Sequence, residues 1–160
     1  MRLVFDIEFD SLDLFKVKNV WCMVVADLDS DDLWRYGPDE IRDGIAKLAT
    51  ADQLIGHNII EADLPVLRKL YGFETDARII DTLVLSRHSF PDRKLCIQAV
   101  AGTKATHPHS LEAWAGRLGT VNKVQNDDWS QFSENMMQRC VNDVLINKQV
   151  YIALLKEFSK

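Results

Sequence analysis

The sequence predicts an α/β domain in which helices cover a mixed β-sheet. Short apolar runs, which are typical of strands, alternate with segments of helical periodicity in the first half of the chain. Two further helical segments close the chain, and the last of them is long. The order is therefore three strands, helix, strand, helix, strand and then helices, which is the order of an α/β domain.

The predicted strands are short and mostly apolar, and they cover residues 3–7, 20–26, 33–36, 53–56 and 79–81. The acid-rich stretch 27–32 predicts a hairpin turn, so we expect the third strand to be antiparallel to the second. The predicted helices cover 37–49, 62–71 and 110–119, and a long one begins after Ser133. Segment 89–106 shows no periodicity and predicts a mobile loop.

Composition favours one globular domain that spans residues 1–160. Hydrophobic residues make up 47% of the chain and charged residues 27%, which excludes a disordered protein. No apolar run approaches the roughly 20 residues that cross a bilayer, so we expect no membrane association. Asp6 and Glu8 come too early for a secretory signal. Three separated cysteines without a CxxC pair indicate reduced thiols and a cytoplasmic location.

The formal net charge of −5 excludes a protein that a broad basic surface holds on DNA. It is compatible with an enzyme whose clustered acids bind cations, because bound cations supply the positive charge that meets a phosphate. Weak and salt-sensitive binding to nucleic acid is then expected, together with a partner that delivers the substrate.

Asp6 and Glu8 lie two residues apart at the end of the first predicted strand. Side chains at this spacing point to the same face of a sheet, where two carboxylates repel unless a cation or a proton intervenes. Hard oxygen ligands of this kind suit Mg²⁺ or Mn²⁺. The alternative is an exposed strand edge, or acids that cap the next turn.

Two further acids lie in the predicted helices. Asp63 is at the start of a helix, near Pro65, where an Asp is most often a cap or a partner of the helix dipole. Asp143 lies near the apolar stripe of the last helix, where a buried carboxylate is costly unless it is paired or binds a metal. Each acid alone is weak evidence, whereas the ordered set of four is specific.

Taken in order, the acids and their neighbours resemble the DEDD exonuclease superfamily, and specifically the proofreading domain of family A DNA polymerases of phage and bacterial type. The three exonuclease motifs of that family match residues 5–13, 57–63 and 136–144. Segments 81–87, 109–114 and 117–119 look like intervening segments of phage replicative polymerases. The resemblance covers nearly the whole chain, and no polymerase domain follows.

This resemblance implies a ribonuclease H-like fold and a stand-alone 3′→5′ exodeoxyribonuclease. Such an enzyme releases 5′-mononucleotides from single-stranded DNA 3′ ends by a two-metal mechanism. Asp6 would bridge two Mg²⁺ or Mn²⁺ ions, Glu8 and Asp143 would complete one site, and Asp63 would hold the other ion through water. The role implied is proofreading or end-trimming in trans with a DNA polymerase that lacks its own exonuclease, in the host cytoplasm if a phage encodes the chain.

The resemblance also implies three substrate-binding residues. Phe9 and Leu12 would line the pocket for the terminal nucleotide, with Leu12 wedged against a base, and Asn58 would lie near the penultimate nucleotide. The alternative for Phe9 and Leu12 is packing in the core. A single-stranded end is expected, because it must be splayed into such a pocket.

The resemblance breaks at Arg139. Family members carry a Tyr four residues before the last Asp or a His five before it, and this chain has Arg139 and Gln138 there. Arg139 stays protonated and is no general base, but it shares a helix face with Asp143, and its planar fork would bind a phosphate oxygen. The alternative is a plain surface salt bridge with Glu134 or Asp143.

Three interpretations of the chain remain open. Arg139 acts as a phosphate clamp in a working exonuclease, or one of three histidines (His88, His107 or His109) takes the missing role, or the chain is a catalytically weakened accessory module that binds DNA or a polymerase. For His109 a local hydrogen bond at a helix start is the simpler expectation. RNA trimming is a further alternative, which the polymerase-like segments disfavour.

Overall fold

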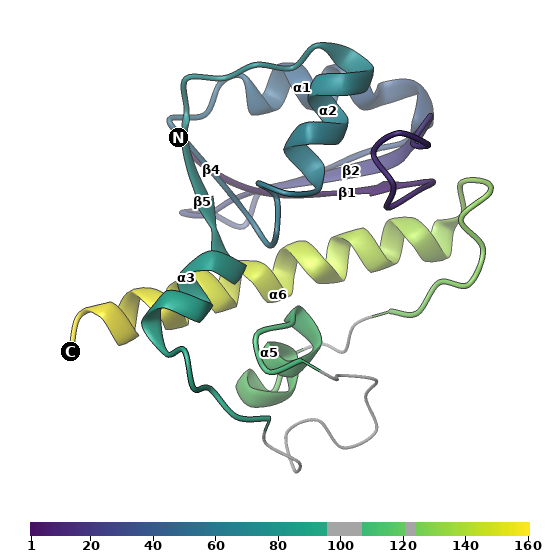
Figure 1. The fold of residues 1–160 in the computed structure, drawn as a ribbon. Coiled ribbons are helices and arrows are strands. Elements are labelled where there is room, and N and C mark those ends of the chain that lie inside the picture. The colour runs from purple at the N-terminus through teal and green to yellow at the C-terminus, as the bar shows by residue number, and fades with distance from the viewer. Residues whose placement is uncertain (96–106, 121–123) are drawn as a thin grey trace.

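A five-stranded sheet is the centre of the fold in the computed structural model, which describes residues 1–95, 107–120 and 124–160 (Figure 1). The strand order is β3-β2-β1-β4-β5. β1 is antiparallel to β2 and β2 to β3, whereas β4 is parallel to both β1 and β5. The bounds are Arg2–Phe9 (β1), Val20–Asp27 (β2), Leu33–Tyr36 (β3), Gln53–Gly56 (β4) and Arg78–Asp81 (β5). The predicted mixed sheet is confirmed.

The odd-numbered side chains of β1 point to the face that α1 (Ile41–Leu48) and α2 (Asp63–Tyr71) cover (Figure 1). Leu3, Phe5 and Ile7 are buried there, because side chains alternate between the two faces of a strand. Burying an apolar side chain of this size contributes about 1.5–3 kcal/mol. This core fixes β1, and with it the direction of the even-numbered side chains.

The long helix α6 (Glu134–Phe158) crosses the opposite face of the sheet (Figure 1). The apolar stripe predicted for it packs on the strands in a second core, which contains Val4, Cys22, Val24, Ile55, Cys140, Val141 and Val144. Asp6 and Glu8 follow Val4 at intervals of two, so they lie on the same face as α6. The first and third motifs therefore meet between β1 and α6.

Two shorter helices, α3 (Thr82–Ser89) and α5 (Leu111–Leu118), pack against α6. A third apolar cluster joins them, made of Leu111, Trp114, Ala115, Ile146, Val150 and Leu154. The sequence did not predict α3. It begins at Asp81, whose carboxylate accepts the N–H groups of Leu83 and Val84 and so caps the helix.

Other expectations need small corrections. The predicted helix 37–49 is divided into a short 3₁₀ helix, η1 (Pro38–Glu40), and α1. Of the predicted mobile loop, the residues 96–106 lie outside the described part of the chain.

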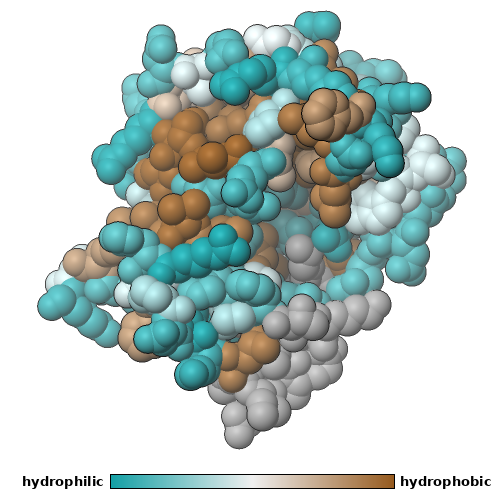
Figure 2. Space-filling model, in the orientation of Figure 1, coloured by the Kyte–Doolittle hydropathy of each residue, from teal (hydrophilic) through white to brown (hydrophobic). Residues whose placement is uncertain are grey.

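None of the described helices is both long and apolar enough for a membrane span. Hydrophobic side chains reach the face shown in Figure 2 in separate groups among hydrophilic ones.

Candidate active site

A cavity of about 470 Å³ lies beside the C-terminal half of β1. β1 pairs with β4 only through residues 2–4, so its later residues extend past the end of β4. All eight residues singled out in the sequence line this cavity: Asp6, Glu8, Phe9, Leu12, Asn58, Asp63, Arg139 and Asp143. Six further residues complete the lining: Ile7, Asp10, Ser11, His57, Leu111 and Trp129.

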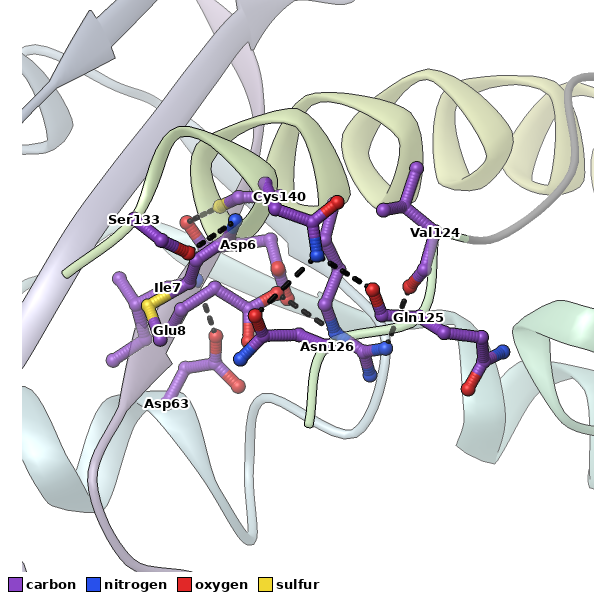
Figure 3. Close-up of polar contacts among 12 residues, drawn as sticks. Asp6, Ile7, Glu8, Asp63, Val124, Gln125, Asn126, Ser133 and Cys140 are labelled. Atoms are coloured by element: carbon purple, nitrogen blue, oxygen red, sulfur yellow. Dashed lines mark hydrogen bonds and ion pairs between the residues drawn. The ribbon is translucent and has the colours of Figure 1, made fainter. Parts of the chain in front are cut away.

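Asp63 reaches the cavity because α2 begins next to the open edge of β1. The backbone N–H of Ile7 donates to Oδ1 of Asp63 at 3.1 Å (Figure 3). Helix α2 begins at Asp63 itself, and Ala62, the residue before it, has no side chain that can cap the helix. Burial and the neighbouring charge of Asp6 raise the pKa of Asp63 well above its usual range, although the Ile7 hydrogen bond opposes this.

Helix α6 brings Asp143 to the same cavity, and its carboxylate is buried, as the apolar stripe predicted. One turn earlier, the thiol of Cys140 donates to the backbone carbonyl of Asp6 at 3.2 Å and ties α6 to β1 (Figure 3). One ligand atom each of Asp6, Glu8 and Cys140 lie within 4.8 Å of one another. The packing of α6 on β1 thus holds the Cys140 thiol beside the two carboxylates of β1, and Asp143 is near enough for its charge to raise the pKa of Glu8.

The carboxylates are costly to ionise together. Burial raises the pKa of Glu8 to about 10, with Asp6 adding to the effect and Arg139 opposing it. A divalent cation removes this cost, and four carboxylates are the hard oxygen donors that Mg²⁺ and Mn²⁺ prefer. The donor set of Asp6, Glu8, Asp63 and Asp143 therefore fits such ions.

Arg139 is not the surface residue of the alternative expectation. Its side chain is only 17% exposed, and its Nε lies 3.2 Å from Oε1 of Glu8, which is itself 8% exposed. Its Nη1 donates to the carbonyl oxygen of Val124 at 2.8 Å (Figure 3). Its Cζ lies 5.3 Å from the centre of the Trp129 ring, within cation–π range. Arg139 is therefore a fixed cation inside the acidic cavity.

The raised pKa of Glu8 predicts that the metal-free protein loses stability as the pH rises. The folded state holds the Glu8 proton more tightly than the unfolded state, so the stabilisation is present below the ordinary pKa of 4.5 and is lost on the way to about 10. Burial lowers the pKa of His109, so this residue changes the stability only below its usual pKa of 6.5. Between pH 7 and 9.5 we therefore expect the free energy of unfolding in EDTA to fall, with Glu8 contributing at most about 1.4 kcal/mol per pH unit. The Tm should fall with it.

Differential scanning fluorimetry across this pH range checks the expectation. Mg²⁺ or Mn²⁺ should restore more stability at high pH than at low pH, because metals compete with protons for the carboxylates. The variant Glu8→Gln should flatten the pH dependence. A Tm in EDTA that is constant or rises between pH 7 and 9.5 contradicts the prediction.

The loop after β4 is held by a carboxylate that the sequence analysis missed. Asp81, at the end of β5, accepts the N–H of Asn58 through Oδ1 at 2.9 Å and the N–H of Ile60 through Oδ2 at 3.1 Å. Asn58 has a left-handed backbone (φ 62°), which Asn tolerates better than most residues. His57 also lines the cavity, and its Nδ1 lies 2.9 Å from Oγ1 of Thr82. The end of one strand thus positions the loop that follows its neighbour.

Phe9 and Leu12 lie where the substrate pocket was expected. Leu12 is 95% exposed, so core packing is wrong for this residue, whereas Phe9 is half-buried and also packs against the first core. Leu12, Phe9 and Asn58 line a second cavity of about 270 Å³ as well. Leu12 therefore stands between two hollows of the surface. The amine of Lys69 donates to the carbonyls of Leu14, Phe15 and Val17 and so fixes the loop behind it.

The histidines considered as substitutes for the missing Tyr or His lie away from the cavity. The ring of His88 stacks on Phe158. His109 is buried, and its Nδ1 lies 2.8 Å from Oγ of Ser86 on α3, so the expected local hydrogen bond is wrong. None of His88, His107 and His109 belongs to the described lining of the cavity. The sequence missed Trp129, because its polar neighbours carry no periodic signal that marks a site.

The chain is similar in sequence to two phage DNA polymerases. No family model matches the chain. The DNA-directed DNA polymerases of Escherichia phage T7 and Enterobacteria phage T3 are each 30% identical to it over 97% of its length. The chain spans only 27% of these polymerases.

Solved structures show the same fold at low sequence identity. Brucella melitensis NrnC has a TM-score of 0.71 and 16% identity, over 99% of this chain and 74% of that one. Escherichia coli RNase D, an exoribonuclease, has a TM-score of 0.63 and 17% identity, over 99% of this chain and 40% of that one. The chain has the ribonuclease H-like fold of DEDD-type 3′→5′ exonucleases. In sequence it is similar to a segment of the phage T7 and T3 polymerases.

Proposed function

We propose that the chain is a metal-dependent 3′→5′ exonuclease that releases 5′-mononucleotides from single-stranded DNA ends. The observation that carries the proposal is the convergence of Asp6, Glu8, Asp63 and Asp143, from three separate elements, on one cavity. The exposed Leu12 and the half-buried Phe9 border that cavity and provide apolar surface for a splayed terminal base.

Two divalent ions complete the proposal. Asp6, Glu8 and Asp143 would hold one ion, and Asp63 would hold a second one with Asp6. Ions bound there supply the activation of water and the neutralisation of charge that an in-line displacement at phosphorus needs. One structure similar in fold, that of Brucella melitensis NrnC, contains bound Mg²⁺. Either Mg²⁺ or Mn²⁺ fits the donor set.

Arg139 supplies the contact that the usual Tyr or His makes elsewhere. It is the only Lys or Arg among the described residues that line the cavity, and its planar guanidinium suits a non-bridging phosphate oxygen. It cannot accept a proton from water, so the carboxylates and the ions carry that part of the chemistry.

DNA is the proposed substrate because the relatives with 30% identity are DNA polymerases. A solved complex of similar fold, Escherichia coli ExoI, contains single-stranded DNA. Because the chain spans 27% of the relatives, we propose that residues 1–160 form one exonuclease domain. The proposed role is proofreading or end-trimming for a DNA polymerase.

The test uses a 5′-labelled single-stranded oligonucleotide with Mg²⁺ and separately with Mn²⁺. We expect a ladder that shortens from the 3′ end, and we expect EDTA or the variant Asp6→Ala to abolish it. Asp31→Ala, an exposed acid in the turn after β2, is the matched control and should keep full activity. A parallel RNA oligonucleotide of the same sequence decides between DNA and RNA.

The second candidate is a catalytically weakened module that binds DNA or a polymerase. The ion pair between Arg139 and Glu8 favours it, because it engages a carboxylate that a metal would need. No shortening in either metal, from a folded chain that still binds the oligonucleotide, would support this candidate and overturn the exonuclease.

A further inference from the structure

Arg139 provides the acidic cavity with a cation of its own. Its guanidinium lies against Glu8 on one side, donates to the Val124 carbonyl on another, and packs over the Trp129 ring. These three contacts come from β1 and from the segment before α6, so the charge is fixed in place. The ion pair with Arg139 thus partly neutralises the Glu8 carboxylate.

A metal and Arg139 compete for the same carboxylate. The Arg139 contact is made to Oε1 of Glu8, and Glu8, Asp6 and Cys140 place ligand atoms within 4.8 Å of one another. A divalent ion at these ligands would therefore lie close to the guanidinium. Two cations held this close together repel, so Arg139 weakens the binding of the ion.

A phosphate changes this balance. The described contacts of Arg139 use Nε and Nη1, so within the described residues both hydrogens of Nη2 are left for another acceptor. A phosphate oxygen that accepts them places a negative charge between the guanidinium and the ion. The guanidinium and the ion are then both attracted to the phosphate, which offsets the repulsion between them. Glu8 becomes available to the metal.

We infer that Arg139 couples the two ligands of the site, so that the divalent ion binds weakly without a nucleotide and tightly with one. This inference rests on the proposed function, because it assigns a regulatory role at the same cavity. By linkage the coupling is reciprocal, and the ion must tighten nucleotide binding by the same factor. The site therefore loads metal mainly when a nucleic acid end is present.

The test measures binding and not turnover. The chain of 160 residues is titrated with Mn²⁺, and free Mn²⁺ is followed by electron paramagnetic resonance, with and without thymidine 5′-monophosphate. Mn²⁺ bound by the nucleotide alone is subtracted. We expect the nucleotide to tighten Mn²⁺ binding by about tenfold in the unaltered chain. In Arg139→Gln, Mn²⁺ alone should bind about tenfold more tightly, and the nucleotide should add little. Arg35→Gln, an exposed arginine on β3, is the matched control and should behave like the unaltered chain.

The outcomes separate this inference from the proposed function. If Arg139→Gln is folded by circular dichroism and its Mn²⁺ affinity is unchanged or weaker, the coupling is overturned, even where the oligonucleotide ladder shows an exonuclease. An unaltered chain whose Mn²⁺ affinity ignores the nucleotide overturns it as well. Coupling without a ladder would support the role of Arg139 and reject the exonuclease.

Discussion

Replacing Asp143 by Asn is expected to lower 3′-end shortening by at least about 10³-fold, which corresponds to about 4 kcal/mol of transition-state stabilisation. Asp143 is buried on α6 and faces the cavity that Asp6 and Glu8 share. Asn keeps the shape of the side chain and removes its charge, so the fold is retained while an anionic ligand of the ions is lost.

The same substitution should raise the Tm of the metal-free chain. Coulombic repulsion from Asp143 is one of the causes that raise the pKa of Glu8, so removing this charge relieves part of the cost of ionising the cluster. Single-turnover rates on a labelled oligonucleotide check the expected loss of activity, and melting curves in EDTA check the expected rise in Tm. An active Asp143→Asn enzyme would remove this residue from the catalytic set. A lower Tm in EDTA would contradict the expected repulsion among the acids, because it would show that Asp143 stabilises the metal-free fold.

Replacing Asp81 by Ala is expected to be the most damaging single change to stability, at about 3–5 kcal/mol. The Asp81 carboxylate is buried and accepts the N–H groups of Asn58, Ile60, Leu83 and Val84. These bonds hold the loop that carries Asn58 and cap α3 at the same time. Ala leaves four partly buried N–H donors without their acceptor, and each donor loses a hydrogen bond to a charged group.

For a domain of this size the expected loss corresponds to a Tm about 10 °C lower. Asp81→Asn keeps one acceptor oxygen, so its stability should lie between those of the unaltered chain and of Asp81→Ala. The matched control is Asp76→Ala, because Asp76 is exposed. Urea unfolding at pH 7 measures the free energy directly. If Asp81→Ala costs less than about 1 kcal/mol, the carboxylate does not hold the loop.

The parts of the site that follow a local period were predictable from the sequence. Asp6 and Glu8 share a face because strands have a period of two, and Asp143 is buried because it lies near an apolar helical stripe. The pairing of Arg139 with Glu8 was not predictable, because it depends on how α6 lies across β1. The role of Asp81 was not predictable either, because its hydrogen bonds reach the loop that follows the neighbouring strand.

The fold follows the same division. Strands with continuous apolar runs and the long last helix were found close to their observed bounds. The helix α3 was missed because its start depends on a cap from Asp81, and its position depends on packing against α6. Short helices of this kind are stabilised by tertiary contacts more than by their own sequence.

The third apolar cluster has an evolutionary consequence. It joins α3, α5 and α6 apart from the two cores that grip the sheet, and it supplies Leu111 to the wall of the cavity. The four acids lie on β1, which is a strand of the sheet, and on α2 and α6, which pack against the sheet. Substitutions in α5 can therefore accumulate and reshape that wall while the acids keep their places. Such a division lets related chains diverge in what they degrade without rebuilding the chemistry.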